Sequence, residues 1–174
     1  HVEFGIAEQD MCSTACGLAA AGLYPWIHSF SCFLTTRAQE QIFNFSTEKR
    51  PGVFVGCLSG ITPSAPGHSH QMTRDLPLMS TIPHCKSVEP VTSKQTKEIV
   101  DKMGSQLGIY YLRIANCSYI DYGDEFAINL PESEGDLTVY KNVKGSNSAL
   151  VITSAEIWNQ VSAALVRNRD NKLI

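Results

Sequence analysis

Residues 5–9 read Gly5-Ile6-Ala7-Glu8-Gln9, and they separate an extended run at 1–4 from a segment of small side chains at 11–22. This order predicts a strand that turns into a helix, with Glu8 at the turn. A carboxyl group in such a place can be partly buried and act as an acid. The alternative is that Glu8 only complements the dipole at the start of the helix.

The chain up to residue 116 alternates between strand and helix patterns. Apolar runs bounded by turn residues predict strands at 25–30, 52–58, 85–89 and 109–114. Apolar residues at helical spacing predict helices at 33–48, 72–80 and 93–106, and Gly22 is expected to stop the helix of 11–22. Such alternation is typical of an α/β fold, a three-layer arrangement in which a parallel sheet carries helices on both faces.

The segment 59–69 is punctuated by glycines and prolines, so we expect a loop there. Loops that follow the strands of a parallel sheet commonly hold ligands. This loop leads into Gly67-His68-Ser69-His70-Gln71. Two histidines two positions apart can suggest a metal, but no third ligand is near them in the sequence, so we expect no metal site on this chain.

Composition narrows the possible functions of the 174-residue chain. A formal charge of −3 disfavours binding to nucleic acid or to an anionic membrane. No apolar run approaches the roughly 20 residues that span a bilayer. The six cysteines form no C-x-x-C pair, so free thiols and a cytoplasmic location are expected.

Three motifs occur in a fixed order: Gly5-Ile6-Ala7-Glu8-Gln9, then Phe30-Ser31-Cys32-Phe33-Leu34-Thr35-Thr36-Arg37-Ala38-Gln39-Glu40-Gln41, then Gly67-His68-Ser69-His70-Gln71. Together they resemble the pyrimidine-binding domain of the transketolase family of thiamine diphosphate enzymes, which includes deoxyxylulose phosphate synthase and separate C-terminal transketolase subunits. The resemblance extends from His1 to about Asn116 and implies the pyrimidine-domain fold of that family. It also implies thiamine diphosphate as cofactor, whose thiazolium carbon becomes a nucleophile and whose ring then serves as an electron sink.

The resemblance implies a cofactor site formed by Ile6, Glu8, Phe30 and Phe33. Glu8 corresponds to the catalytic carboxyl group that hydrogen-bonds the aminopyrimidine ring and favours its imino tautomer. Phe33 corresponds to the residue that stacks on this ring, and Phe30 lines the same pocket. From the residues alone, two phenylalanines at this spacing are more typical of an ordinary core.

By the same resemblance, Arg37, His70 and Arg113 are candidates for substrate binding. His70 matches a catalytic histidine that contacts the substrate carbonyl or hydroxyl and can carry a proton near neutral pH. For Arg37 the alternative is a surface ion pair, and for Arg113 it is a structural ion pair. Nothing in the sequence assigns a role to His68.

The expected organisation is a pyrimidine-binding domain at 1–117, a linker at 118–147 and the beginning of a C-terminal transketolase-like domain at 148–174. The linker is expected because 118–147 is acidic and contains Gly and Pro, without metal-ligand spacing. Because the chain starts with His1 inside a predicted strand, we expect the pyrimidine domain to lack its leading elements.

The sequence also departs from the family pattern. Pro66 and Leu58 replace an acidic residue and a histidine of sugar-phosphate transketolases, and Asn116 replaces an arginine. No G-D-G motif, which binds magnesium and the diphosphate in the family, is found in the sequence. We therefore expect Mg²⁺ to be bound mainly by a pyrophosphate-binding domain or subunit of a homo- or hetero-oligomer, most simply a dimer.

These observations lead to three hypotheses. The first is the pyrimidine-binding part of a transferase that moves a two-carbon ketol unit between sugar phosphates. The second is a condensation of a keto acid with an aldehyde, as in deoxyxylulose phosphate synthase. The third is a non-catalytic partner subunit. Retention of Glu8, Phe33 and His70 argues against it, whereas replacement of polar family residues by Leu58 and Pro66 argues for it.

Overall fold

Parallel strands form the sheet of this computed structural model, which describes residues 1–62 and 65–116. The strands lie in the order β1-β2-β4-β3. Their bounds are β1 Trp26–Phe30, β2 Gly52–Ser59, β3 Cys85–Val88 and β4 Ile109–Ala115. The predicted linker at 118–147 and the predicted second domain at 148–174 lie outside the described residues.

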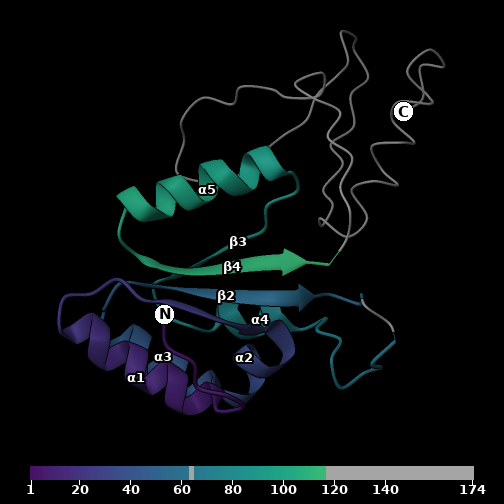
Figure 1. Ribbon diagram of the computed structural model, residues 1–174, viewed down its shortest axis with the longest axis horizontal. Helices are drawn as coiled ribbons and strands as arrows, with labels where there is room; N and C mark the ends of the chain where they lie inside the picture. The colour runs from purple at the N-terminus through teal and green to yellow at the C-terminus, as the bar shows by residue number, and fades with distance from the viewer. Residues whose placement is uncertain (63–64, 117–174) are drawn as a thin grey trace, which may run out of the picture. The chain divides into compact units, whose positions relative to one another are not determined.

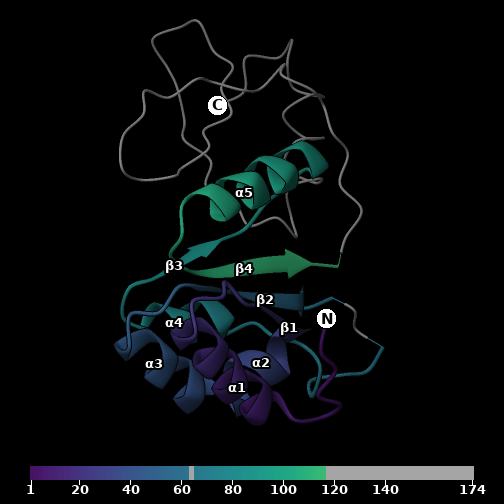
Figure 2. The same ribbon diagram turned by 60° about the vertical axis from the view of Figure 1, so that its left-hand side comes forward.

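Helices cover both faces of the sheet. Figures 1 and 2 show α5 (Ser93–Ser105) alone on one face and the other helices together on the opposite face. These are α1 Glu8–Ala20, α2 Ser31–Arg37, α3 Gln39–Thr47 and α4 Asp75–Ser80. The three-layer α/β fold predicted from the sequence is therefore confirmed.

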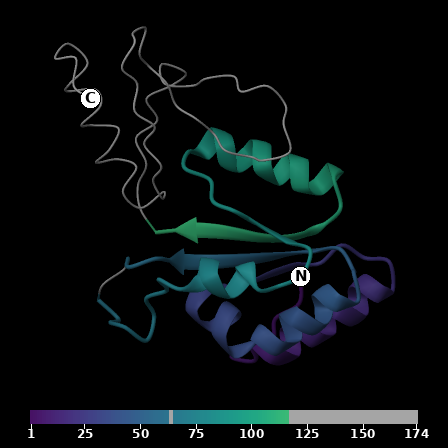
Figure 3. The ribbon, with the colours of Figure 1, turned by 180° about the vertical axis from the view of Figure 1, so that it is seen from behind.

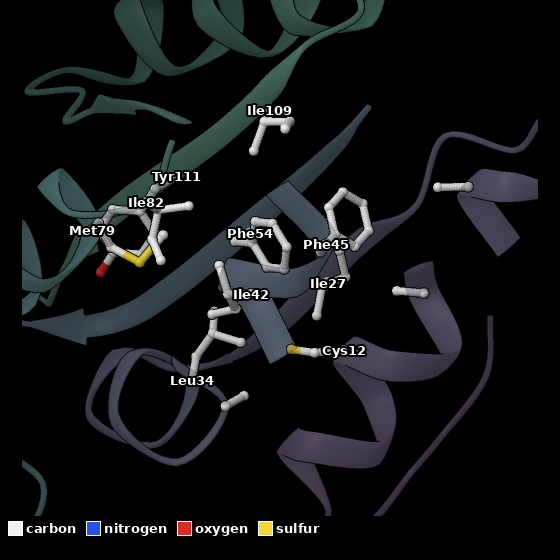
Figure 4. Packing of buried hydrophobic residues seen from close by; sticks show 13 residues of the cluster. Cys12, Ile27, Leu34, Ile42, Phe45, Phe54, Met79, Ile82, Ile109 and Tyr111 are labelled. Atoms are coloured by element: carbon white, nitrogen blue, oxygen red, sulfur yellow. The ribbon is translucent and has the colours of Figure 1, made fainter. Parts of the chain in front are cut away.

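Neighbouring residues of the central strands bury their side chains on opposite faces. Phe54 of β2 packs among the apolar side chains of α1–α4, and its ring meets the Phe45 ring edge-on at 5.1 Å (Figure 4). Val53, the residue before it, packs with Leu112 and with Met103 of α5. Strands that are buried on both faces need continuous apolar sequence, which explains why 52–58 contains few polar residues.

The small-residue helix begins earlier than predicted, because α1 starts at Glu8 and not near residue 11. Its end agrees with the prediction: Gly22 has φ 91°, and its N–H donates to the carbonyl of Ala19. A residue with this φ ends a helix without the strain that a Cβ would cause. The predicted strand at 1–4 was wrong, since these residues form no strand in the described structure and Val2 is 65% exposed.

The single helix predicted at 33–48 was also wrong, because α2 and α3 are separated at Ala38 (φ −101°, ψ 17°). Two threonines lie in the last turns of α2. Thr35 Oγ1 donates to the carbonyl of Ser31 at 2.8 Å, and Thr36 Oγ1 donates to that of Cys32. Hydroxyl groups that bond to the preceding turn commonly bend a helix, which gives a physical reason for the break.

The helix predicted at 72–80 begins only at Asp75. Met72 instead pairs with Gly60 in an antiparallel bridge, with N···O distances of 2.6 and 2.7 Å. The loop after β2 is thereby closed at its base. Figure 3 shows that β2 and β4 point the same way, with this loop beyond the end of β2. No helix within the described ranges is long and apolar enough to cross a membrane.

Candidate active site beside the ends of β1 and β2

Glu8 is the first residue of α1, yet its side chain does not cap that helix. The residue is 7% exposed, and no side-chain cap bond is made at Ala7. Glu8 Oε1 accepts a hydrogen bond from Ser29 Oγ at 3.4 Å, and Oε2 accepts one from Arg37 Nη1 at 3.2 Å. The carboxyl group is therefore directed toward the junction of β1 and α2 and away from the helix axis.

Arg37 makes two contacts with predicted cofactor residues. Besides its ion pair with Glu8, the guanidinium carbon lies 4.0 Å from the centroid of the Phe33 ring. The ion pair is half-buried, because the side chain of Arg37 is 45% exposed while that of Glu8 is 8% exposed. One planar cation thus covers the carboxyl group and the aromatic face that the sequence assigns to the cofactor.

Phe30, Phe33 and His70 form an aromatic cluster. Their ring centroids are 5.8 Å apart for the two phenylalanines, 5.2 Å for Phe33 and His70, and 6.3 Å for Phe30 and His70. Phe30 is 39% exposed, which is unusual for a core residue. The structure brings together three residues that the sequence assigned to one site.

The loop after β2 holds His70 against this cluster. Ser69 Oγ lies 3.0 Å from His70 Nδ1, and the His70 N–H donates to the carbonyl of Gly67. Gln71 Nε2 donates to the carbonyl of Ile61 across the loop at 2.9 Å. Between this loop and α2 lies an open pocket of about 260 Å³. Its lining residues are Cys32, Phe33, Thr36, Arg37, His68, Ser69, Gln71, Met72 and Arg74.

Of the predicted site residues, Phe33 and Arg37 line this pocket. Glu8 lies beside it through its contact with Arg37, and His70 through its contact with Phe33.

Two further predicted residues are not brought to this place. Ile6 lies in the turn before α1 and is 89% exposed, so its cofactor-binding role stays a prediction. Arg113 is 5% exposed, and its guanidinium donates to Asp75 at 2.7 Å and to Glu89. The structural ion pair that was the alternative for Arg113 is present, and its substrate-binding role stays a prediction.

A buried polar cluster around Asp75 was missed in the sequence. Asp75 Oδ2 accepts hydrogen bonds from Tyr111 OH at 2.8 Å, from Arg113 Nε at 2.7 Å and from Ser31 Oγ at 3.4 Å. Burial would lower the pKa of Arg113, but Asp75 and Glu89 outweigh it and leave that pKa raised. Burial and the Asp75 charge raise the pKa of Tyr111, so its hydroxyl remains a donor.

The thiols near the site are not activated. Burial, with a smaller effect of the Glu8 charge, raises the pKa of Cys12 to about 12. Burial also raises the pKa of Cys32, which lines the pocket. A thiol must ionise to act as a nucleophile, so the chemistry of this site lies with its carboxyl, imidazole and guanidinium groups.

Comparison with known proteins decides the family. Residues 1–114 match the model of the family described as "Transketolase, pyrimidine binding domain". The chain belongs to this family. The recognition made from the three sequence motifs is therefore confirmed.

Among curated relatives, a "Putative transketolase C-terminal section" of Methanocaldococcus jannaschii is 30% identical over 155 residues, covering 88% of this chain and 48% of the relative. A "6-deoxy-6-sulfo-D-fructose transketolase subunit SqwH" of Clostridium sp. is 30% identical over 145 residues, covering 79% of this chain and 45% of the relative. The chain thus spans about half the length of these relatives.

Among solved structures, a "Split gene transketolase, inactive beta4 tetramer" matches with a TM-score of 0.60 and 30% identity. The match covers 68% of this chain and 38% of the other. The transketolase pyrimidine-domain fold is thus supported by sequence and by structure.

Proposed function

We propose that this chain is the pyrimidine-binding part of a thiamine diphosphate-dependent transferase that moves a two-carbon ketol unit between sugar phosphates. The observation that carries the proposal is the approach of Glu8, Phe33 and His70 to one another: Arg37 contacts both Glu8 and Phe33, and the His70 ring lies 5.2 Å from the Phe33 ring. These three residues lie far apart in the sequence, on α1, α2 and the loop after β2. Membership of the transketolase family supports the same reaction class.

The residues present fit the pyrimidine ring of the cofactor. A planar group with N–H donors, the Arg37 guanidinium, already binds the Glu8 carboxyl group and stacks on Phe33. An aminopyrimidine is also planar and carries N–H donors, so the same two side chains suit it. Glu8 and Phe33 would hold the ring, with Phe30 and Ile6 beside it. When bound, the cofactor supplies an acidic thiazolium carbon and an electron sink.

The chain's own residues would bind, orient and exchange protons. Glu8 exchanges a proton with a nitrogen of the pyrimidine ring, while Ser29 keeps the carboxyl group oriented. Phe33 excludes water from the same region. His70 lies against Phe33, next to Ser69 and Gln71 of the pocket lining, and moves a proton at a substrate oxygen. Arg37, once displaced from Glu8, binds an anionic part of the substrate.

The diphosphate and Mg²⁺ would be held mainly by another domain or subunit. The sequence has no G-D-G motif. Within 1–62 and 65–116, no group of three or more His, Cys, Asp or Glu residues could hold a metal ion. The relatives described as a "C-terminal section" and a "subunit" support an oligomer in which this chain completes a site with a partner. The described cysteines are free thiols, which supports a cytoplasmic location as part of the proposal.

A second candidate reaction is the condensation of a keto acid with an aldehyde. Leu58 stands at the end of β2 where sugar-phosphate transketolases have a histidine by the resemblance, and Pro66 stands where they have an acidic residue. Loss of these polar groups removes hydrogen bonds that a sugar substrate would use. The same replacements would also suit a partner subunit without catalysis.

The test is an activity assay of the chain combined with a chain that carries the pyrophosphate-binding domain. Ketol transfer from a ketose phosphate to an aldose phosphate, abolished by Glu8→Gln, is the expected result. Product formed only from pyruvate and an aldehyde would support the second candidate instead. Saturable cofactor binding by the complex without turnover of either substrate pair would support the non-catalytic subunit. A matched control is Glu3→Gln, because the Glu3 side chain is 81% exposed.

A further inference from the structure

One hydroxyl group joins the separate segments that form the pocket. Tyr111 of β4 is fully buried, and its OH lies 2.8 Å from Asp75 Oδ2, 2.5 Å from Ser31 Oγ and 3.5 Å from Ser59 Oγ. The phenol has a single proton, which it donates to Asp75. Its oxygen is then free to accept from Ser31, whose proton lies between Tyr111 and Asp75, while Ser59 Oγ donates to the carbonyl of Gly56.

Each partner of Tyr111 lies next to a part of the pocket. Ser31 stands between Phe30 and Cys32 at the start of α2, two residues before Phe33. Ser59 is the last residue of β2 and directly precedes Gly60, which pairs with Met72 at the base of the loop. Tyr111 therefore connects the strand that enters the loop with the helix that carries Phe33.

Asp75 fixes the other end of the loop. It is the first residue of α4, is 1% exposed, and follows the loop that carries His70. Arg113 holds the same carboxylate oxygen from β4. Asp75 is thus bonded to two buried side chains of β4, and Ser59, at the other end of the loop, lies 3.5 Å from one of them. Buried networks with all partners present are rigid, because any rearrangement leaves a desolvated polar group unpaired.

The packing around the hydroxyl leaves it little freedom. A Cβ added at Gly56 of β2 would lie 2.5 Å from Tyr111 OH and 2.7 Å from the ring. Only glycine at this position lets the phenol cross the strand and reach Ser31 and Asp75. The Tyr111 ring is therefore held in place by β2. Its hydroxyl group makes the contacts that join the separate segments.

We propose that Tyr111 and Asp75 are positioning residues, which hold the His70 loop at a fixed distance from Phe33 and so align the proton-transferring imidazole with the cofactor face. This inference rests on the proposed function, because it concerns the substrate side of the same pocket. It adds residues that touch neither substrate nor cofactor. The 5.2 Å contact between the Phe33 and His70 rings is the distance that the network sets.

The test substitution is Tyr111→Phe, which keeps the ring over Gly56 and removes only the hydroxyl. The matched control is Tyr110→Phe, one residue away, whose hydroxyl donates to the carbonyl of Gln106 at the surface. In the complex with a partner chain, we expect Tyr111→Phe to lower kcat about tenfold or more and to leave cofactor affinity within about threefold. Tyr110→Phe should change neither quantity.

A double-mutant cycle separates positioning from general destabilisation. If Tyr111 acts through His70, then Tyr111→Phe should have little further effect in a His70→Ala background. Effects on kcat that multiply would contradict the inference, as would equal behaviour of Tyr111→Phe and Tyr110→Phe. If Tyr111→Phe does not fold, Ser31→Ala removes one partner of the hydroxyl and is tested in the same cycle.

Hydrogen exchange on the chain itself tests the inference without turnover. We expect amides of residues 65–72 to exchange about tenfold faster in Tyr111→Phe than in the wild type, while those of α1 stay unchanged. Unchanged exchange at 65–72 would show that Tyr111 does not hold the loop. Failure of the proposed function would be recognised separately, as a wild-type complex that neither binds thiamine diphosphate nor turns over.

Discussion

Arg37 Nη1 lies 3.2 Å from Glu8 Oε2, although the two residues are 29 positions apart in the sequence. The same guanidinium stacks over the Phe33 ring. Both surfaces that we assign to the aminopyrimidine ring are therefore occupied by a side chain of the same chain. Binding of the cofactor requires Arg37 to leave them.

This competition predicts that Arg37→Met has opposite effects on the binding of the cofactor and on the binding of the substrate. An exposed cation–π contact and a half-exposed ion pair each contribute about 0.5–1 kcal/mol, together about 1–2 kcal/mol, so their loss should strengthen cofactor binding by the partner complex roughly five- to thirtyfold. Loss of the cation should raise the KM of an anionic substrate about tenfold. Calorimetric titration and steady-state kinetics measure the two effects. Arg50→Met is the control, and a weaker cofactor affinity in Arg37→Met would contradict the competition.

Phe33→Ala should weaken cofactor binding strongly, because the ring provides the stacking surface. Truncation of a packed aromatic residue costs on the order of 3 kcal/mol, or roughly a hundredfold in affinity. The measurement is a cofactor titration of the partner complex. Phe43→Ala on α3, where the phenylalanine is 44% exposed, provides a matched control. Equal affinities in the two variants would place Phe33 in the ordinary core.

His70→Ala should lower the rate of the steps that involve the substrate, without weakening cofactor binding. The imidazole lies against Phe33 from the loop, and loss of a general acid or base commonly costs about a hundredfold to ten-thousandfold in kcat. Cofactor affinity should remain within about threefold, because Glu8 and Phe33 are unchanged. His68→Ala, two residues away and itself part of the pocket lining, shows whether the effect is specific. A parallel loss of cofactor binding in His70→Ala would assign it another role.

The stability of the fold should fall in alkaline solution. Burial raises the pKa of the Cys12 and Cys85 thiols from 9.0 to about 12, so between these values the unfolded chain releases protons that the folded chain retains. The stabilisation is complete below pH 9 and is lost as pH rises toward 12, by about 1.4 kcal/mol per thiol and pH unit. Urea unfolding between about pH 8 and about pH 10.5 measures the slope. A slope that stays the same in Cys12→Ala would remove that thiol from the explanation.

The sequence predicted the layers of the fold because the apolar runs of β2 and β4 are long enough to be buried on both faces. Helix ends were less accessible to prediction. Nothing in the apolar spacing of 33–48 shows the break at Ala38, which accompanies hydroxyl bonds from Thr35 and Thr36 to the preceding turn. The later start of α4 likewise depends on a bridge between Gly60 and Met72 that only the folded chain makes.

The sequence predicted residues of the candidate site, but it did not predict the contacts among them. Glu8, Phe33 and His70 followed from motifs, whereas the Arg37 bridge between Glu8 and Phe33 depends on how α1 packs beside α2. The network of Tyr111, Asp75, Ser31 and Arg113 joins residues as far apart as Ser31 and Tyr111, which are 80 positions apart. Of the four, the sequence singled out Arg113 alone, and the others resemble ordinary core or surface residues. A possible signal was Asp75 at the start of a short helix next to the histidine loop.

The central claim is that Glu8 belongs to a thiamine diphosphate site that a second chain completes. The most direct measurement is calorimetric titration of thiamine diphosphate with Mg²⁺ into three samples: this chain alone, this chain with a partner that carries the pyrophosphate-binding domain, and the same complex with Glu8→Gln. We predict binding that requires magnesium in the wild-type complex, no measurable binding to the chain alone, and at least about tenfold weaker binding in the variant. Tight, magnesium-dependent binding by the isolated chain, or equal affinity of the wild-type and Glu8→Gln complexes, would contradict the account.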